Sequence, residues 1–334
     1  MPVPKISVLI PTYRYAGYLK ETLDSVLSQE SADFEVIVSD DCSGDGTAEL
    51  IAGYAARDPR VRAHVHLQNI GMVQNWNWCL RESRGEYIKY VFGDDMLAEP
   101  RALAKMSAML DANPRAVLAA CARNVIDEHS RVTEVWSHLG TPGVQHGGNT
   151  VWRCLSGDIN IVGEPTAVMF RRSAGIRGFS ERYDQLVDLE MWCHLLCGGA
   201  LVYSDEPLCC FRCHALQRTE FNRARGIHSA EMLQLTHEYY SHPALRGQGA
   251  GAVPSAGAVL FARIYRTRKS ARHDPAALEQ RALLMSVLGR PSYCTRWLWR
   301  KITNPFASLA RSIAKRRVRS GKNRPPHSPA PSPF

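Results

Sequence analysis

The sequence predicts an α/β fold in which a mostly parallel sheet is flanked by helices. Residues 6–10 and 34–38 are short, apolar, β-branched runs typical of buried strands, and an amphipathic helical pattern lies between them. A strand, a helix and a second strand in succession imply parallel pairing through a right-handed crossover. The composition agrees, because 45% hydrophobic and 22% charged residues are typical of a globular protein with a packed core.

The N-terminal elements follow in order along the chain. The first strand ends at Pro11, and a helix follows in which apolar residues recur on one face, namely Leu19, Leu23, Val26 and Leu27. The second strand ends at Asp40 and Asp41, and a turn at residues 43–47 leads into a helix at residues 48–56. Ligands of open α/β sheets bind outside the carboxyl ends of the strands, so we expect a ligand beside both strand ends.

The central part of the chain continues the alternation of strands and helices. The same patterns predict strands at residues 61–66, 87–92, 117–121, 168–170 and 201–203, and helices at residues 73–83, 100–112 and 186–197. Residues 138–150 are rich in Gly, Pro, Thr and His and fit neither pattern. We therefore expect a mobile loop over the site there.

The length of 334 residues leaves room for one large α/β domain and an appendage. We assign residues 1–245 to the α/β domain, residues 246–321 to a helical, basic C-terminal region and residues 322–334 to a disordered tail. The formal net charge is +9, yet residues 280–334 alone contain twelve Lys or Arg and no Asp or Glu. The excess positive charge is therefore local, which predicts an anionic partner of this region.

Residues 296–319 combine an apolar stripe with Arg and Lys, as helices that lie on an anionic membrane surface do. The alternative is a helix that docks on the α/β domain and exposes its basic side. No nucleic-acid recognition motif accompanies the basic residues, so specific nucleic-acid binding is not expected. We find no apolar run of about 18 residues and no secretory signal, which predicts a cytoplasmic protein, peripheral at the inner face of the cell membrane.

Two pairs of carboxylates, Asp40-Asp41 and Asp94-Asp95, follow predicted strands. Acidic side chains gathered at one edge of a sheet repel each other and require a cation or hydrogen-bond donors. Mg²⁺ or Mn²⁺, held by carboxylates and bridging a diphosphate, would meet this need. In the alternative reading, Asp40, Asp41 and Asp45 shape an Asx turn and Asp94-Asp95 caps a helix. The occurrence of both pairs at strand ends favours the ligand site.

An ordered set of motifs resembles the inverting family 2 glycosyltransferases of GT-A fold. The resemblance rests on residues 7–13 (SVLIPTY) and 36–47 (VIVSDDCSGDGT), on Asn69-Ile70-Gly71 with Asn75, and on residues 85–89 (GEYIK) followed by Gly93-Asp94-Asp95. It covers about residues 5–220. It implies a Rossmann-like, mostly parallel sheet in the catalytic domain, with the basic helical region as a C-terminal extension.

The resemblance also implies a binding site for a nucleotide-sugar donor. Asp41 would read the base and ribose with support from Asp40, and the site would comprise Pro11, Thr12, Tyr13, Asp40, Asp41, Asn69, Asn75, Asp94 and Arg212. The family's Asp-x-Asp metal motif corresponds to the segment in which Phe92 replaces the first Asp. The Mg²⁺ or Mn²⁺ ligands would therefore be Asp94, Asp95 and His214.

The general base of the family is an acidic residue that precedes a Trp by four positions, at the start of a helix. Residues 187–192 (VDLEMW) occupy this place, so the resemblance makes Asp188 the base, although Val187 replaces the family's preceding Glu. A carboxylate near the acceptor hydroxyl can take its proton as the oxygen attacks the anomeric carbon. Glu190 is the competing candidate, and it points away from Asp188 if the segment is helical.

The closing segment of the family resembles residues 211–219, where Arg212 and His214 would offset the charge of the leaving diphosphate. Predicted acceptor-side residues are Glu164, Trp192 and Gln217. The same region contains a C-x-x-C-H string at residues 210–214, which is also the attachment signature of c-type haem. A zinc site built from His194, Cys197, Cys210 and Cys213 is a second alternative.

Together these features predict a metal-assisted, inverting glycosyltransferase that transfers a sugar from a UDP- or dTDP-sugar to a glycan or lipid-linked acceptor. A nucleotidyltransferase is an alternative, disfavoured because no Gly- and Lys-rich loop follows the first strand. The other alternative is a non-catalytic protein that binds sugar nucleotides or polyanions, for which the replacements at Phe92 and Val187 are the main support.

Overall fold

A computed structural model describes residues 3–30, 32–214, 227–240 and 242–245 of the protein. The predictions for Gln217, for the basic region at 246–321 with its membrane-binding segment 296–319, and for the tail at 322–334 lie outside the described residues. None of the helices in the described part is long and apolar enough to span a membrane.

The strands of the described part form one mixed sheet. Its order is β3 (Val61–Val65), β2 (Phe34–Asp40), β1 (Ile6–Thr12), β4 (Tyr87–Tyr90), β9 (Val168–Arg171), β6 (Ala116–Ile126), β10 (Ala200–Arg212) and β5 (Met96–Leu97). The first four are mutually parallel, and β6 and β10 are parallel to each other. The strand between these two groups, β9, is antiparallel to both neighbours.

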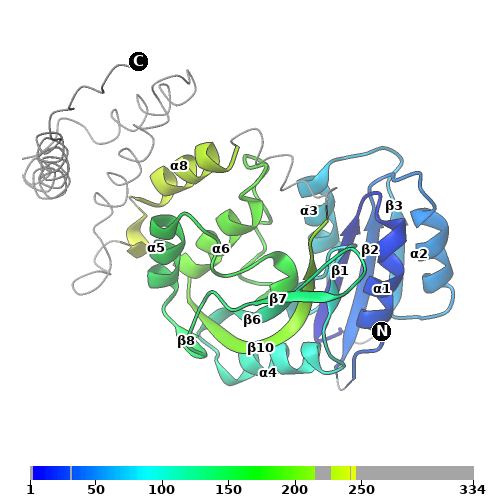
Figure 1. The fold of residues 1–334 in the computed structure, drawn as a ribbon, viewed down its shortest axis with the longest axis horizontal. Coiled ribbons are helices and arrows are strands. Elements are labelled where there is room, and N and C mark those ends of the chain that lie inside the picture. The colour runs from blue at the N-terminus through cyan, green and yellow to red at the C-terminus, as the bar shows by residue number, and fades with distance from the viewer. Residues whose placement is uncertain (1–2, 31, 215–226, 241, 246–334) are drawn as a thin grey trace, which may run out of the picture. The chain divides into compact units, whose positions relative to one another are not determined.

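Helices cover both faces of the sheet because successive strand residues point to opposite sides. Ile6, Val8 and Ile10 of β1 belong to one core with the buried sides of α1 (Ala16–Leu27), α2 (Thr47–Ala55) and α4 (Ala102–Ala112). Leu9 belongs to the opposite core, under α3 (Met72–Glu82), α5 (Gly147–Gly157), α6 (Val187–Cys197) and α8 (Ile227–Tyr240). Figure 1 shows α4 below the long strand β10 and α5, α6 and α8 above it.

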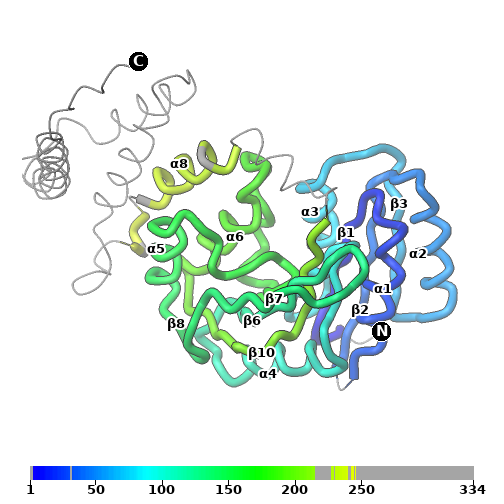
Figure 2. Tube along the Cα trace, viewed as in Figure 1, coloured from blue at the N-terminus to red at the C-terminus, as the bar shows by residue number. Residues whose placement is uncertain are grey.

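The chain builds the sheet in two successive parts. Figure 2 shows the blue N-terminal segments gathered at one end and the green and yellow segments at the other. The chain runs outward from β1 to β2 and β3 and then returns to the other side of β1 with β4. This reversal between β1 and β4 is the kind of switch point at which open α/β sheets bind ligands.

The predicted fold class is confirmed, and each strand and helix listed above is present within a few residues, with some strands much longer. Pro11 does not end β1, which continues to Thr12. Pairing with β4 stops at Leu9, so the missing N–H of Pro11 faces no strand on that side. The strand predicted at 201–203 extends over thirteen residues as β10, with bulges against β6 near residues 204–209 that interrupt its apolar pattern.

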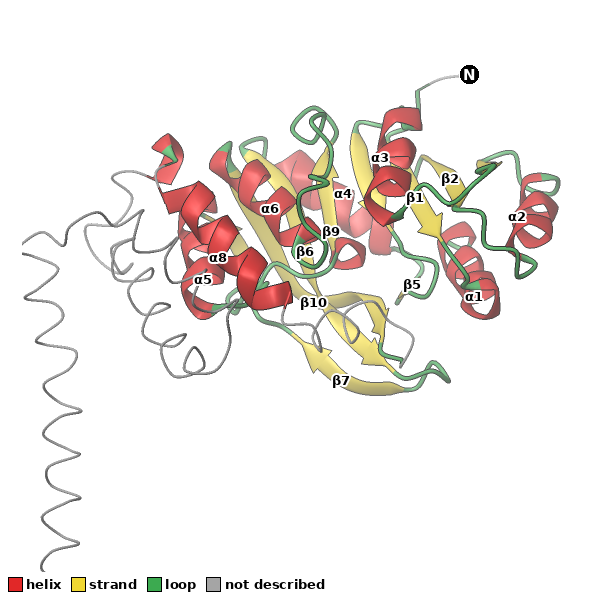
Figure 3. Ribbon diagram, turned by 90° about the horizontal axis from the view of Figure 1, so that it is seen from above, coloured by secondary structure: helices red, strands yellow, loops and turns green. Residues whose placement is uncertain are grey.

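The expectation of a mobile loop at residues 138–150 is wrong. The segment contains β8 (Gly143–Gln145), which pairs with β10, and the first turn of α5. Gly147 serves close packing, because a Cβ there would lie 2.0 Å from the backbone oxygen of Gly199. The prediction also missed β7 (Val132–Trp136), which forms a hairpin with β6 on the side away from the helices (Figure 3), and it missed α8.

Candidate active site

The carboxyl end of β1 forms one wall of the candidate site. Thr12 is buried, and its Oγ1 has no hydrogen-bond partner among the described residues. A Cβ on Gly93, which follows β4, would lie 2.6 Å from this oxygen, so the two strand ends meet without space for a side chain. Tyr13 is exposed at the surface beside Arg14, whereas Pro11 is buried within the strand.

The first carboxylate pair divides into two roles. Asp40 accepts hydrogen bonds from the hydroxyl and the backbone N–H of Ser43, three residues further on. The Asx turn of the alternative reading lies at Asp45, whose Oδ1 accepts from the N–H of Thr47 at 3.2 Å. Asp41 accepts from the N–H groups of Ile70 and Gly71 at 2.7 and 2.9 Å. Asp41 therefore fastens the end of β2 to the loop that precedes α3.

The two predicted asparagines support this arrangement. Asn69 donates to the backbone oxygen of Asp41 at 3.1 Å. Asn75 is buried, donates to the backbone oxygen of Ser39, and lies 3.3 Å from the His66 ring nitrogen. Both residues hold the backbone around Asp41, and a direct contact of either with a donor stays a prediction.

The two carboxylates of the second pair, Asp94 and Asp95, also have different partners. Asp95 is buried, and its oxygens accept from Thr166 Oγ1 at 2.5 Å and from the backbone N–H of Arg212 at 2.9 Å. Burial and the neighbouring charge of Asp94 raise its pKa well above the usual range. Asp94 instead lies with Oδ2 3.1 Å from His214 Nε2, so strand ends more than a hundred residues apart in sequence meet at this point.

Two tyrosines that the sequence reasoning missed surround the Asp94–His214 pair. The Tyr15 hydroxyl contacts Asp94, and burial and that carboxylate raise its pKa. The rings of Tyr15 and Tyr18 lie 5.8 and 5.2 Å from the His214 ring. Tyr15 lies only two positions after the SVLIPTY motif, and this proximity was the available sequence signal.

Arg212 is buried at the end of β10, and its guanidinium contacts protein oxygens. It donates to the backbone oxygens of Asp94 and Asp127 at 2.7 and 3.0 Å and pairs with Glu21 at 2.8 Å. The Tyr18 ring lies 4.6 Å from the guanidinium carbon. Arg212 therefore organises the segment around Asp94, and its predicted contact with a diphosphate stays a prediction.

The metal site predicted from sequence is brought together only in part. Asp94 and His214 face each other, but the Asp95 oxygens are engaged by Thr166 and Arg212. Among the described residues, no three acidic, His or Cys side chains gather as a complete ligand set. The pair fits a cation that takes its remaining ligands from a diphosphate and water. Phe92, in place of the motif's first Asp, stacks on Trp76 at 4.7 Å between ring centroids and packs against the core.

Asp188 lies in the first turn of α6. Its Oδ2 accepts from Asn160 at 2.9 Å, and its Oδ1 from the N–H of Leu189 at 2.7 Å. Burial, followed by the negative charge of Glu164, raises the pKa of Asp188 to about 7. A carboxyl group whose pKa lies near neutrality is suited to take and release a proton. Asn160, which the sequence reasoning did not select, is the residue that orients it.

Glu164 connects the two ends of the site. Its negative charge raises the pKa of Asp188 and also that of Asp95, so it lies within electrostatic reach of both. Arg123, a second residue missed from sequence, balances it: the Arg123 Nε to Glu164 Oε2 distance is 2.5 Å. The hydroxyl of Thr166, two residues further on, binds Asp95. Asp188 and the Asp94–Asp95 end therefore share the loop at residues 163–166.

Trp192 is not placed for direct contact with an acceptor. It is 1% exposed, lies among the aromatic side chains of the core, and donates from Nε1 to the backbone oxygen of Gly163 at 2.9 Å. This corrects the prediction of an acceptor-binding residue, because the hydrophobic face of α6 buries the indole. Trp192 acts on the site through the loop that carries Glu164.

The zinc alternative from the C-x-x-C-H string is wrong for the four proposed ligands. His194, Cys197, Cys210 and Cys213 are all described, and no three of them come together. Cys210 is buried and contacts Asn124, whereas Cys213, which follows Arg212 in sequence, is exposed. Alternation along the end of β10 separates the two cysteines.

Comparison with known proteins gives the family. The profile of the family described as Glycosyl transferase family 2 matches residues 7–174, which is half of the chain and includes both carboxylate pairs. The chain belongs to this family. The family 2 chain is 32% identical over 214 residues to MT1568 of Mycobacterium tuberculosis, covering 61% of this chain and 66% of that protein.

A second relative of the family 2 chain is EpsE of Bacillus subtilis, whose name marks it as a proposed glycosyltransferase. It is 29% identical over 191 residues, which cover 57% of this chain and 66% of EpsE. The family 2 chain thus spans just under two thirds of the length of these two relatives.

Solved structures share the fold. TarS of S. aureus (residues 1–349, in complex with UDP-GlcNAc) superposes with a TM-score of 0.62 at 17% identity, covering 84% of this chain and 79% of that one. The mannosyltransferase PcManGT of Pyrobaculum calidifontis, in complex with GDP-Man and Mn²⁺, has a TM-score of 0.53 at 17% identity, covering 93% and 83%. The family 2 chain therefore has the GT-A-type α/β fold of these transferases.

Proposed function

We propose that this chain transfers a sugar, with inversion, from a UDP- or dTDP-sugar to a hydroxyl group of a glycan or lipid-linked acceptor. The observation that carries the proposal is the environment of Asp188. Its carboxyl group has a pKa raised to about 7, is oriented by Asn160, and is electrostatically linked through Glu164 to the Asp94–Asp95 end of the site. A base at one end and a diphosphate site at the other is the arrangement that a single displacement needs.

The proposed reaction proceeds in one step. Ionised Asp188 takes the proton of the acceptor hydroxyl as that oxygen bonds to the anomeric carbon of the donor. The bond from the anomeric carbon to the diphosphate oxygen breaks at the same time, and the nucleoside diphosphate leaves with that electron pair. Attack from the face opposite the leaving group inverts the anomeric centre.

A divalent cation, Mg²⁺ or Mn²⁺, would be held by Asp94 and His214. When bound, it would stabilise the negative charge that develops on the leaving diphosphate. The Asp94 carboxylate is a ligand that suits either ion. Asp95, whose oxygens are engaged by Thr166 and Arg212, would support this pair rather than bind the cation directly.

The nucleotide would lie beside the ends of β1 and β2. Asp41, already fastened to the loop at Ile70 and Gly71, retains lone pairs that can accept from a base or ribose. Thr12 Oγ1, buried and without a partner among the described residues, is a further polar contact for the donor. The structures of the fold relatives with UDP-GlcNAc and GDP-Man support a nucleotide-sugar donor in general.

The acceptor would belong to cell-envelope polysaccharide synthesis at the cytoplasmic face of the membrane. TuaG of Bacillus subtilis, 30% identical over 108 residues that cover 32% of this chain and 43% of TuaG, is named as a proposed teichuronic acid biosynthesis glycosyltransferase. The basic segment at 296–319 would hold the protein at an anionic lipid surface.

The test is a panel of sugar nucleotides incubated with the purified chain and a mixture of glycan acceptors. Release of nucleoside diphosphate together with a glycosylated product, at a rate that Asp188→Asn lowers at least about 100-fold, is the expected result. Consumption of a nucleoside triphosphate with pyrophosphate release would identify a nucleotidyltransferase instead. Tight binding of a sugar nucleotide without turnover would mean a non-catalytic protein.

A further inference from the structure

One carboxylate of α8 binds three consecutive backbone groups just before α6. Glu231 of α8 accepts hydrogen bonds from the N–H groups of Asp184, Gln185 and Leu186 at 2.6, 2.9 and 2.8 Å. Glu231 is 8% exposed, so water competes little for these bonds. Successive N–H groups that converge on one anion form a nest, which requires a fixed backbone conformation.

These three residues lead directly into the helix that carries Asp188. Leu186 is the N-cap residue of α6, and its own side chain forms no capping hydrogen bond. A helix start without a cap leaves donors unsatisfied and frays. Glu231 lies 45 residues from Leu186 in sequence. It therefore caps the backbone that leads into α6, as a local capping residue does in other helices.

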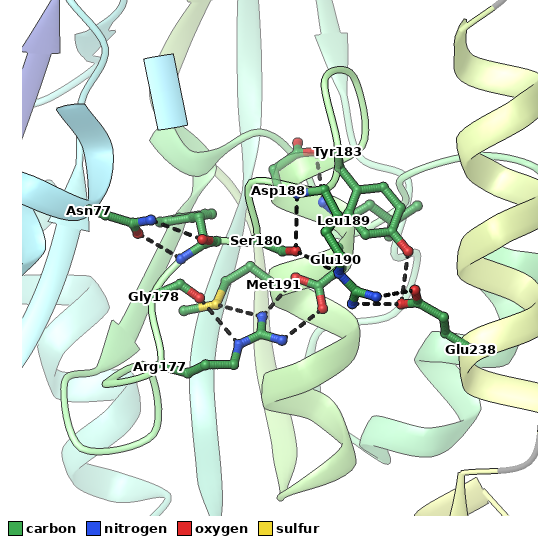
Figure 4. Close-up of polar contacts among 12 residues, drawn as sticks. Asn77, Arg177, Gly178, Ser180, Tyr183, Asp188, Leu189, Glu190, Met191 and Glu238 are labelled. Carbon is green, nitrogen blue, oxygen red and sulfur yellow. Dashed lines mark hydrogen bonds and ion pairs between the residues drawn. The ribbon is translucent and has the colours of Figure 1, made fainter. Parts of the chain in front are cut away.

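Other side chains of α8 contact the segments that lead to Asp188 and to Asn160. Glu238 pairs with Arg182 at 2.7 Å. It also accepts from the Tyr183 hydroxyl at 2.9 Å (Figure 4). His228 Nε2 lies 3.6 Å from Asp158, two residues before the Asn160 that binds Asp188. One helix thus contacts both the loop and the helix start that fix the position of the base.

We propose that Glu231 is a positioning residue for Asp188, acting from α8 through the backbone of residues 184–186. Asp188 follows Leu186 by two residues. The backbone conformation that Glu231 holds at residues 184–186 therefore sets the position of the Asp188 side chain. This inference rests on the proposed function in that Asp188 must be the base. Because Glu231 does not contact the donor site, its removal should affect the chemical step and leave donor binding intact.

The chain offers a matched control on the same helix. Glu238 lies seven residues after Glu231 and therefore on the same face of α8. It binds the side chains of Arg182 and Tyr183, whereas Glu231 binds the backbone that enters α6. Because Arg182 is largely exposed, the Glu238 pair contributes little to stability.

The kinetic test compares Glu231→Gln, which retains the size and one acceptor oxygen, with Glu238→Gln. We expect Glu231→Gln to lower kcat by about 10–100-fold with the donor KM changed less than about twofold, since small misplacement of a reacting group has effects of this size. Glu238→Gln should keep kcat within about twofold. Equal effects of the two variants, or a loss confined to donor KM, would overturn the proposal. If Glu231→Gln does not fold, Glu231→Asp provides the same comparison with the charge retained.

A double mutant separates positioning from general stability. In the Asp188→Asn background, Glu231→Gln should have no further effect on the residual transfer rate, because both changes act through the same group. A full multiplicative loss would refute a role exerted through Asp188.

Hydrogen exchange tests the contact without any catalysis. Amides of residues 184–190 should exchange faster in Glu231→Gln and at the wild-type rate in Glu238→Gln. Unchanged exchange in both variants would overturn the positioning role. If exchange is faster in Glu231→Gln but the wild-type chain transfers no sugar, the contact is established and the proposed function is rejected.

Discussion

Glu190 Oε1 and Oε2 accept from the two terminal nitrogens of Arg177 at 2.8 and 2.7 Å, and this bidentate pair neutralises Glu190 inside the core (Figure 4). Asp188, two residues earlier on the same helix, has no cationic partner among the described residues, and the pKa of its carboxyl group is raised to about 7 by burial and by Glu164. Two neighbouring carboxylates thus have different chemistry because α6 turns them toward different surroundings. The sequence left Glu190 open as a competing base, and the structure favours Asp188.

Asp188→Asn should lower the transfer rate by about 10²–10⁴-fold, the range over which general bases contribute. Asparagine keeps the size of the side chain and can still bond with Asn160, so the affinity for UDP measured by calorimetry should remain within about threefold. A large loss of UDP affinity, with the fold intact, would mean that Asp188 belongs to the donor site.

Transfer by the wild-type chain should depend on pH through Asp188. The base must be ionised, so kcat is expected to fall about tenfold per pH unit below a midpoint near 7, the pKa to which burial and Glu164 raise this carboxyl group. The midpoint should move to lower pH in Glu164→Gln, which removes a negative charge that favours the protonated form. A pH profile that is flat between about 5 and 8 would exclude Asp188 as the base.

The same raised pKa predicts that Asp188 destabilises the folded protein at neutral pH. The folded state binds a proton more tightly than the unfolded state, so the free energy of unfolding decreases as pH rises from about 4 to about 7. Asp188→Asn removes this cost and should raise Tm at pH 8 by more than at pH 5. A gain in Tm that is equal at both pH values would contradict the linkage and point to altered packing.

Glu190→Gln should act on stability rather than on the chemical step. Loss of the charge partner leaves Arg177 imperfectly paired, and Arg177 is itself partly exposed, so we expect a loss of about 1–3 kcal/mol in the free energy of unfolding. Urea titration measures this loss. The pH midpoint of transfer should not change, and a shifted midpoint would show that Glu190 takes part in proton transfer.

The strand ends that form the site could be predicted from sequence because each is a local pattern. Apolar runs followed by Asp40-Asp41 and Asp94-Asp95 identify the carboxyl edge of a parallel sheet without knowledge of the tertiary structure. The division of labour within each pair could not be predicted. It depends on Ile70, Thr166 and Arg212, which reach the carboxylates from 29 or more residues away.

The missed elements have a similar cause. The glycines at the start of α5 indicated a loop, but Gly147 is required by close contact with the backbone at Gly199. The role of α8 depends on long-range bonds such as that from Leu186 to Glu231, and no local pattern carries that information. The length of β10 was underestimated because bulges near Pro207 interrupt its alternation.

His214→Ala should weaken the response to metal. If Asp94 and His214 hold the cation, the Mn²⁺ concentration for half-maximal transfer should rise at least about tenfold, and Mn²⁺ binding in the presence of UDP should weaken equally in calorimetry. Cys213→Ser is the matched control, because this neighbouring side chain is exposed and was not assigned to the metal site. Equal Mn²⁺ dependence of both variants would remove His214 from the metal site.

Phe92→Asp, which restores the first acidic position of the family's metal motif, should destabilise the protein without improving metal binding. The Phe92 ring stacks on Trp76 and packs against the core, so its side chain is directed toward the aromatic cluster rather than toward the Asp94–His214 pair. Loss of this packing and introduction of a partly buried charge should cost about 2–4 kcal/mol in the free energy of unfolding. Phe92→Leu, which stays apolar, should cost less and keep the Mn²⁺ dependence of transfer. Tighter Mn²⁺ binding by Phe92→Asp than by the wild-type chain would mean that position 92 faces the cation after all.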